Sequence, residues 1–125
     1  MKYLLDVNVL LAAIWVNHPD HSKSFAWLTG KDILLCPLSE LGFLRISTNK
    51  KAINAPMAKA RKLLERFSAE RNAEWIPDDL DPLHSHPKKS EDVTDLYLAD
   101  LAFKHGAKFA TLDQRLAHNA LEIIS

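Results

Sequence analysis

Short apolar runs alternate with longer amphipathic segments along the whole chain. A short apolar run bounded by turn residues predicts a buried strand, whereas apolar side chains three or four positions apart predict a helix. This pattern predicts strands at residues 3–5, 33–35, 75–76, 108–112 and 121–124, and helices at residues 9–16, 18–30, 37–46, 56–71, 94–105 and 114–117. Strands that alternate with helices indicate an α/β fold, in which helices cover both faces of a mostly parallel sheet.

Residues with known positional preferences set the predicted helix starts. Asn8 and Thr94 are residue types that cap helix N-termini, and Pro37 suits a first helical turn. The helix that starts at Pro37 is predicted to have an apolar face with leucines three residues apart. These leucines are Leu38, Leu41 and Leu44.

The composition indicates one compact domain. The chain has 125 residues, of which 47% are hydrophobic, so residues 1–125 are predicted to form a single domain around a workable core. The one cysteine, Cys36, excludes an intramolecular disulfide. Asp6 and Asn8 interrupt the first apolar segment, which argues against a signal peptide, and no run approaches the roughly 20 apolar residues of a membrane span. We therefore expect a cytoplasmic protein.

Four acidic residues occupy positions that would meet at one edge of the predicted sheet. Asp6 and Asp113 directly follow predicted strands, and Glu40 and Asp95 lie in the first turns of predicted helices. In a parallel sheet, the carboxyl ends of the strands and the helices that follow them share the edge where ligands bind. Clustered carboxylates repel one another, and a bound hard cation is the simplest relief. Oxygen ligands without a Cys or His pair favour Mg²⁺ or Mn²⁺ over Zn²⁺.

Each of these acids also fits an ordinary structural role. Asp6 suits a turn, and Asp113 suits the N-cap of a short helix. Asp95 suits a first-turn position that compensates the helix dipole, and Glu40 suits the solvated face of a helix. Spacing alone leaves the metal site and these structural roles open.

Three segments and the chain length carry a resemblance to a known family. The segments are LLDVNVLLAA from Leu4, SELGFLRISTN from Ser39 and TDLYLADLAFKHGAKFATLD from Thr94. In their order and separation they resemble the PIN domain, specifically the VapC-type toxins of bacterial toxin–antitoxin pairs. This resemblance spans nearly the whole chain. It implies a three-layer α/β/α sandwich with a central mostly parallel sheet, and an acidic pocket in which Mg²⁺ or Mn²⁺ supports hydrolysis of RNA phosphodiester bonds.

The resemblance also assigns roles to individual residues. The four acids of the family correspond to Asp6, Glu40, Asp95 and Asp113, and the polar residues that accompany the first and fourth acids correspond to Asn8 and Thr111. We expect Asp6, Asp95 and Asp113 to be the nearest metal ligands. Glu40 would orient the attacking water or hold a second ion. The family further implies a homodimer and a cognate antitoxin that binds the toxin and blocks its acidic pocket.

Two supporting roles and one chemical outcome follow from this assignment. Asn8 is expected to fix Asp6, and Thr111 is expected to steady the turn at Asp113. Attack by a metal-activated water on the phosphorus predicts products with 5′-phosphate and 3′-hydroxyl ends. Products with 2′,3′-cyclic phosphates would contradict this mechanism.

Charge is balanced overall but unevenly distributed. Sixteen basic residues balance sixteen acidic ones, yet residues 45–71 contain eight basic and two acidic residues, and residues 74–100 contain eight acidic and two basic ones. A basic segment could guide the RNA backbone toward an acidic cleft. The RNA-binding candidates are Arg45, Lys59, Lys62 and Arg66. The last three fit equally the solvated face of an amphipathic helix, whereas Arg45 follows Glu40 on one helix and recurs in the family's pattern.

Two other classes of function are considered beside the nuclease. A protein of this fold could bind RNA or a protein partner without cutting it. A phosphotransfer enzyme with Asp6 as nucleophile is disfavoured, because Asn8 stands where the dehalogenase-type D-x-D signature has its second acid. His84 and His86 fall in a proline-rich segment without a third ligand nearby, which favours loop histidines over a zinc site.

Overall fold

The centre of the molecule is a five-stranded sheet in which every neighbouring pair is parallel. The computed structural model describes residues 1–125. The strands are β1 (Lys2–Leu5), β2 (Asp32–Leu35), β3 (Glu74–Trp75), β4 (Lys108–Thr111) and β5 (Leu121–Ile123). Their order in the sheet is β3-β2-β1-β4-β5, and each neighbouring pair is in parallel register. After β1, the chain adds β2 and then β3 on one side of the sheet. It later adds β4 on the other side of β1, and β5 beyond β4.

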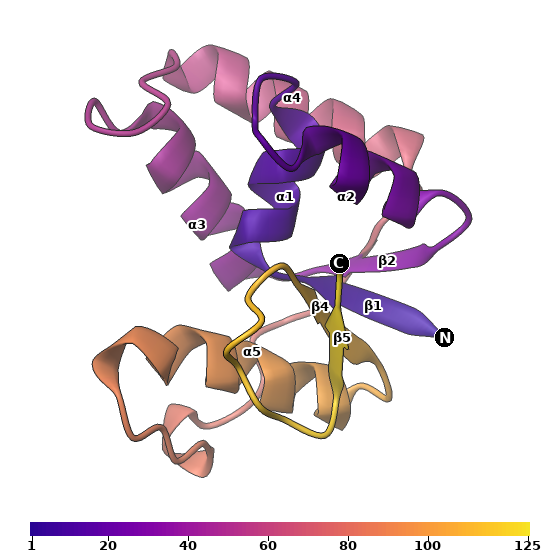
Figure 1. Cartoon of the computed structure of the whole chain (residues 1–125), viewed down its shortest axis with the longest axis vertical. Helices are drawn as coiled ribbons and strands as arrows, with labels where there is room; N and C mark the ends of the chain where they lie inside the picture. The colour runs from indigo at the N-terminus through magenta and orange to yellow at the C-terminus, as the bar shows by residue number, and fades with distance from the viewer.

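Helices cover both faces of this sheet, which makes the three-layer α/β/α sandwich (Figure 1). The helices are α1 (Val7–Ile14), α2 (His21–Leu28), α3 (Pro37–Thr48), α4 (Met57–Glu70) and α5 (Val93–Lys104), and the short 3₁₀ turns are η1 (Pro82–His84) and η2 (Ser90–Asp92). Helices α1 to α4 lie on one face and α5 on the other. None of the helices is long and apolar enough to span a membrane.

The two faces have separate hydrophobic cores because side chains alternate along each strand. In β1, Leu5 belongs to the cluster under α1 to α4, whereas Leu4 belongs to the cluster under α5. In β4, Ala110 and Phe109 divide in the same way. Strands buried on both faces explain why the sequence shows continuous apolar runs at these positions.

Three predicted local features differ in the structure. The first helix begins at Val7 after Asp6, not after Asn8, because the Asp6 carbonyl already accepts bonds from the next turn. The helix predicted from Thr94 begins at Val93. Residues 114–117 form a turn followed by irregular chain instead of a helix, and so short a stretch gains too few hydrogen bonds to sustain a helix.

The leucine pattern predicted the buried face of α3 only in part: Leu38 and Leu44 are half-buried and pack against the two cores, but Leu41 does not. Leu41 is 62% exposed, and the fully buried positions of α3 are small residues together with Phe43. The reason is a close approach between α3 and α1 at Gly42, where an added Cβ would lie 2.5 Å from Cγ2 of Val7. A small residue is therefore required at this helix crossing.

This close approach gives a prediction about stability. Gly42→Ala should lower the free energy of unfolding by about 1 kcal/mol, because overpacking costs of roughly 1–3 kcal/mol exceed the helix-propensity gain of about 1 kcal/mol. In a Val7→Ala background the clash is absent, so the same substitution should become neutral or stabilising. Urea unfolding of the wild type, the two single variants and the double variant measures both effects. Equal effects of Gly42→Ala in the two backgrounds would show that Val7 is not the obstacle.

Candidate active site

The candidate active site lies where the order of strands reverses. Strands β1 and β4 are neighbours, yet the chain continues from them to opposite sides of the sheet. Crevices that bind ligands in open α/β sheets form at the carboxyl ends of such a strand pair. Asp6 directly follows β1, and Asp113 lies two residues beyond the end of β4. The predicted edge position of both acids is confirmed.

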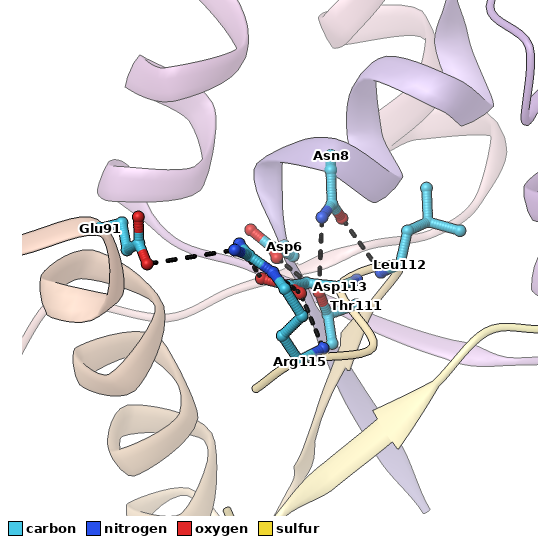
Figure 2. A network of polar contacts seen from close by, with 7 residues as sticks. All are labelled: Asp6, Asn8, Glu91, Thr111, Leu112, Asp113 and Arg115. Carbon is cyan, nitrogen blue, oxygen red and sulfur yellow. Dashed lines mark hydrogen bonds and ion pairs between the residues drawn. The ribbon is translucent and has the colours of Figure 1, made fainter. Parts of the chain in front are cut away.

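A hydrogen-bond network centred on Thr111 holds Asp6 in place (Figure 2). The Thr111 hydroxyl donates to Oδ2 of Asp6 at 2.7 Å and accepts from the backbone N–H of Asp113 at 3.0 Å. The side-chain amide of Asn8 lies 3.4 Å from the same hydroxyl, and its carbonyl oxygen accepts from the backbone N–H of Leu112 at 3.3 Å. Thr111 therefore contacts Asp6 directly, whereas Asn8, which was expected to fix Asp6, contacts Thr111 and Leu112 instead.

Asp6 does not use its side chain to cap α1, although it occupies the N-cap position. Its backbone N–H continues the sheet by donating to the carbonyl of Ala110 at 2.9 Å. Only 3% of Asp6 is exposed, and its carboxylate turns toward Thr111. A buried carboxylate that gives up a capping bond is more consistent with a functional role than with a turn.

The carboxyl groups of Asp6, Asp95 and Asp113 influence one another. Burial, followed by the charge of Asp95, raises the pKa of Asp6 to about 7, although the hydrogen bond from Thr111 partly opposes this rise. Burial followed by the charge of Asp113 also raises the pKa of Asp95, which lies in the first turn of α5. The structure therefore brings these three predicted acids together in one electrostatic site.

Asp113 differs from the other two because it has a cationic partner. Oδ1 of Asp113 accepts from the backbone N–H of Arg115 at 2.9 Å, and the guanidinium contacts both carboxylate oxygens at 3.3 and 3.4 Å. These contacts hold the pKa of Asp113 below its usual value. On its other side the guanidinium lies 4.0 Å from Oε1 of Glu91.

Glu40 has a different orientation from the other predicted acids. It lies in the first turn of α3, as predicted, but its Oε1 accepts a hydrogen bond of 2.9 Å from the indole N–H of Trp75. Its neighbour Ser39 is buried and donates to the carbonyl of Leu5, which fixes the start of α3 beside the end of β1. The backbone of Glu40 is thus near the candidate site, while its carboxylate points to β3.

The donor chemistry of the site suits a hard cation. The side chains of Asp6, Asp95 and Asp113 offer only oxygen ligands. Burial and, after it, the charge of a neighbouring carboxylate raise the pKa of Asp6 and of Asp95, and a nearby cation would favour the charged form of both groups. In the present conformation no three His, Cys, Asp or Glu side chains are close enough to form a metal cage. Side-chain movement would therefore be needed before the three carboxylates could share one ion.

The predicted RNA-binding residues are on exposed faces. Arg45 lies near the end of α3, and Lys59, Lys62 and Arg66 lie along the exposed side of α4. Two of them already have partners: the Lys59 ammonium is 5.9 Å from the Trp15 ring, and Arg66 is 3.7 Å from Glu70. They are accessible, and a solvated-face role explains them as well as RNA binding does.

Comparison with known proteins shows the family of this chain. The sequence profile described as "PIN domain" matches residues 3–121. The chain belongs to the PIN-domain family. Among Mycobacterium tuberculosis proteins, it is 38% identical to ribonuclease VapC44 over 97% of this chain and 92% of that protein, and 34% identical to ribonuclease VapC38 over 88% and 84%. These relatives place this PIN domain among the VapC-type members.

A solved structure supports the fold of this PIN domain. The crystal structure of VapBC2 from Rickettsia felis, bound to a DNA fragment from its promoter, superimposes with a TM-score of 0.65 and 17% identity, and the match covers 98% of each chain. At this level of identity the likeness concerns the fold, and the α/β/α sandwich with its parallel sheet is confirmed.

Sequence reasoning missed two polar residues of this site, Arg115 and Glu91. Both are charged residues at the surface, and nothing in their local pattern distinguishes them from solvated side chains. The one available signal for Arg115 is its spacing from Asp113, since an aspartate commonly accepts a bond from the backbone N–H two residues later. The partner Glu91 depends on the tertiary approach of η2 to the turn after β4.

Proposed function

We propose that this PIN domain, a single domain over residues 1–125, is a metal-dependent endoribonuclease toxin. It hydrolyses RNA phosphodiester bonds with Mg²⁺ or Mn²⁺ as cofactor. The observation that carries the proposal is the buried Asp6 at the strand-order reversal, whose pKa is raised to about 7 by burial and by the charge of Asp95. The ribonuclease relatives, at 34% and 38% identity over most of the chain, supply the reaction class.

The residues of the chain divide into ligands and supports. Asp6, Asp95 and Asp113 would hold the ion. When bound, a divalent cation neutralises charge on the phosphoryl oxygens and makes a water molecule nucleophilic near neutral pH. Thr111 keeps Asp6 oriented through its 2.7 Å hydrogen bond. Asn8 supports this hydroxyl, so the loss of either polar residue would loosen the site rather than remove a ligand.

Glu40 acts at the edge of the same site. Ser39 fixes the first turn of α3 beside the end of β1, so the Glu40 side chain would join the site after it leaves Trp75. There it orients the attacking water or holds a second ion.

The partners of this chain are an RNA substrate, a cognate antitoxin and a second copy of the chain. The proposal of an antitoxin rests on the VapC-type relatives and on a fold neighbour that was solved as a VapBC complex. The homodimer follows from the same family assignment. An antitoxin that blocks the acidic site keeps such a nuclease inactive in the cytoplasm of its own cell.

Cleavage of a labelled RNA by the purified chain tests this function. With Mg²⁺ or Mn²⁺ the chain should cut internal phosphodiester bonds, EDTA should stop the reaction, and added metal should restore it. The alternative function is a non-catalytic module of the same fold that binds RNA or protein. Binding of RNA with no cleavage under any divalent-metal condition would favour that alternative.

The exposed bases on α4 provide a separate test of substrate binding. Reversing the charges of Lys59, Lys62 and Arg66 together should weaken RNA binding by roughly tenfold or more at low salt, because each lost phosphate contact removes an electrostatic contribution. The dependence of affinity on salt should flatten at the same time. Reversing Lys23, Lys31 and Lys108, which lie on other elements, provides a matched control. Unchanged affinity and salt dependence would return the three α4 residues to the solvated-face interpretation.

A further inference from the structure

Arg115 is the one positively charged side chain that directly contacts the predicted metal-ligand set. Its guanidinium spans the gap between the turn after β4 and the segment that leads into α5, with Asp113 on one side and Glu91 on the other (Figure 2). The Nε and Nη2 contacts with Asp113 are 3.3 and 3.4 Å long, and the contact with Glu91 is 4.0 Å. All are longer than the 2.7–2.9 Å of strong charge-assisted bonds.

These side-chain contacts are weak enough to be exchanged. The Arg115 side chain is 74% exposed, and ion pairs in such surroundings contribute little because water and salt screen them. The backbone bond from Arg115 N–H to Asp113 is shorter, at 2.9 Å, and does not depend on the guanidinium. The turn can therefore keep its shape while the side chain leaves Asp113.

We infer that Arg115 is a built-in counter-cation: it occupies Asp113 while no metal is bound, yields this carboxylate to an arriving divalent cation, and then binds a phosphate oxygen of the RNA. The inference rests on the proposed function and specifies how the same site exchanges its charges. A guanidinium and a metal ion that use the same carboxylate oxygens compete, so each weakens the binding of the other.

The chemistry of arginine suits the second half of this exchange. A guanidinium is always charged and presents several N–H donors in a planar fork that matches two phosphate oxygens. Once Asp113 binds the metal, Arg115 stands beside it on an exposed turn with donors to spare, at the edge where RNA would arrive. A lysine at this position would keep the charge but would lose the fork.

Two binding measurements test the inference without relying on turnover. Titration with Mn²⁺ in the absence of RNA should show that Arg115→Met binds the metal about threefold to tenfold more tightly than the wild type, because a competing charge is gone. With saturating Mn²⁺, Arg115→Met should bind a short 5′-phosphorylated RNA roughly tenfold more weakly.

Two further variants control for charge and shape. Arg115→Lys should leave Mn²⁺ affinity near the wild-type value while still weakening binding of the phosphorylated RNA. Lys23→Met, which removes a positive charge from α2, should change neither quantity. Opposite shifts in metal and phosphate affinity for Arg115→Met cannot come from a merely structural role, since local unfolding would weaken both.

The outcomes separate this inference from the nuclease proposal. Unchanged or weaker Mn²⁺ binding by Arg115→Met overturns the inference, as does unchanged affinity of Arg115→Met for the RNA at saturating Mn²⁺. Either result leaves the nuclease function standing if the wild type cleaves RNA. If both shifts occur and the wild type fails to cleave RNA with any divalent metal, the inference about charge exchange holds and the nuclease proposal fails.

Discussion

Asp6→Asn is expected to reduce kcat/KM for RNA cleavage by about 10³-fold or more, since it removes a negative charge from the centre of the metal-binding set. Asparagine has almost the same shape as aspartate, and its side-chain oxygen can still accept the hydrogen bond from Thr111. The fold should therefore survive while the chemistry is lost. Initial rates on a fluorogenic RNA with Mg²⁺ or Mn²⁺ measure the effect.

Asp32→Asn is the matched control for this substitution. Asp32 begins β2, the other strand that pairs with β1, but it is exposed and lies at the opposite end of the sheet from Asp6. Its replacement removes the same charge and should leave the cleavage rate within about twofold, as expected of a surface site. Cleavage by Asp6→Asn at a rate close to that of Asp32→Asn would exclude Asp6 as a metal ligand.

Asp6→Asn is also expected to stabilise the metal-free protein above pH 7. The pKa of Asp6 is raised from 3.8 to about 7 in the folded protein. Because the folded state holds this proton more tightly than the unfolded chain does, the associated stability is fully present below about pH 4 and is lost as pH rises through about 7. This pKa difference corresponds to a decrease of up to about 4 kcal/mol in the free energy of unfolding by pH 8. Asp6→Asn should not show this decrease, because asparagine does not titrate.

Urea unfolding in EDTA at pH 5 and pH 8 measures this effect. The wild type should lose more stability than Asp6→Asn between the two pH values, and saturating Mg²⁺ or Mn²⁺ should restore wild-type stability at pH 8 but not that of the variant. The comparison of the two proteins isolates the titration of Asp6 together with its coupling to the neighbouring carboxyl groups of Asp95 and Asp113. An identical pH dependence for the two proteins would contradict the raised pKa of Asp6.

Sequence periodicity predicted the sheet, its flanking helices and two of the acids because these features depend on local rules. A parallel sheet buried on both faces requires apolar runs, and the residue after such a run must lie at the sheet edge. The position of Asp6 and Asp113 at this edge follows from that rule alone, whereas their role as metal ligands does not. The position of Asp95 in the first turn of α5 could be predicted in the same way, although the exact start of the helix could not.

Features that depend on tertiary packing were not predictable from spacing. The leucine pattern wrongly placed Leu41 on the buried face of α3, because the crossing with α1 at Gly42 selects small residues there. The contact between Glu40 and Trp75 joins residues 35 positions apart. The contact of Arg115 with Glu91 likewise exists only after α5 packs on the sheet.

The chemistry of the RNA ends produced by the purified chain tests the central claim most directly. Products should carry 5′-phosphates and 3′-hydroxyls, they should appear only with a divalent metal, and they should be absent with Asp6→Asn. Ligation-based sequencing that distinguishes 5′-phosphate from 5′-hydroxyl ends, applied to reactions with and without metal and with Asp6→Asn, tests these three expectations. Products that end in 2′,3′-cyclic phosphates, or cleavage that persists in EDTA, would contradict hydrolysis at a carboxylate-held metal.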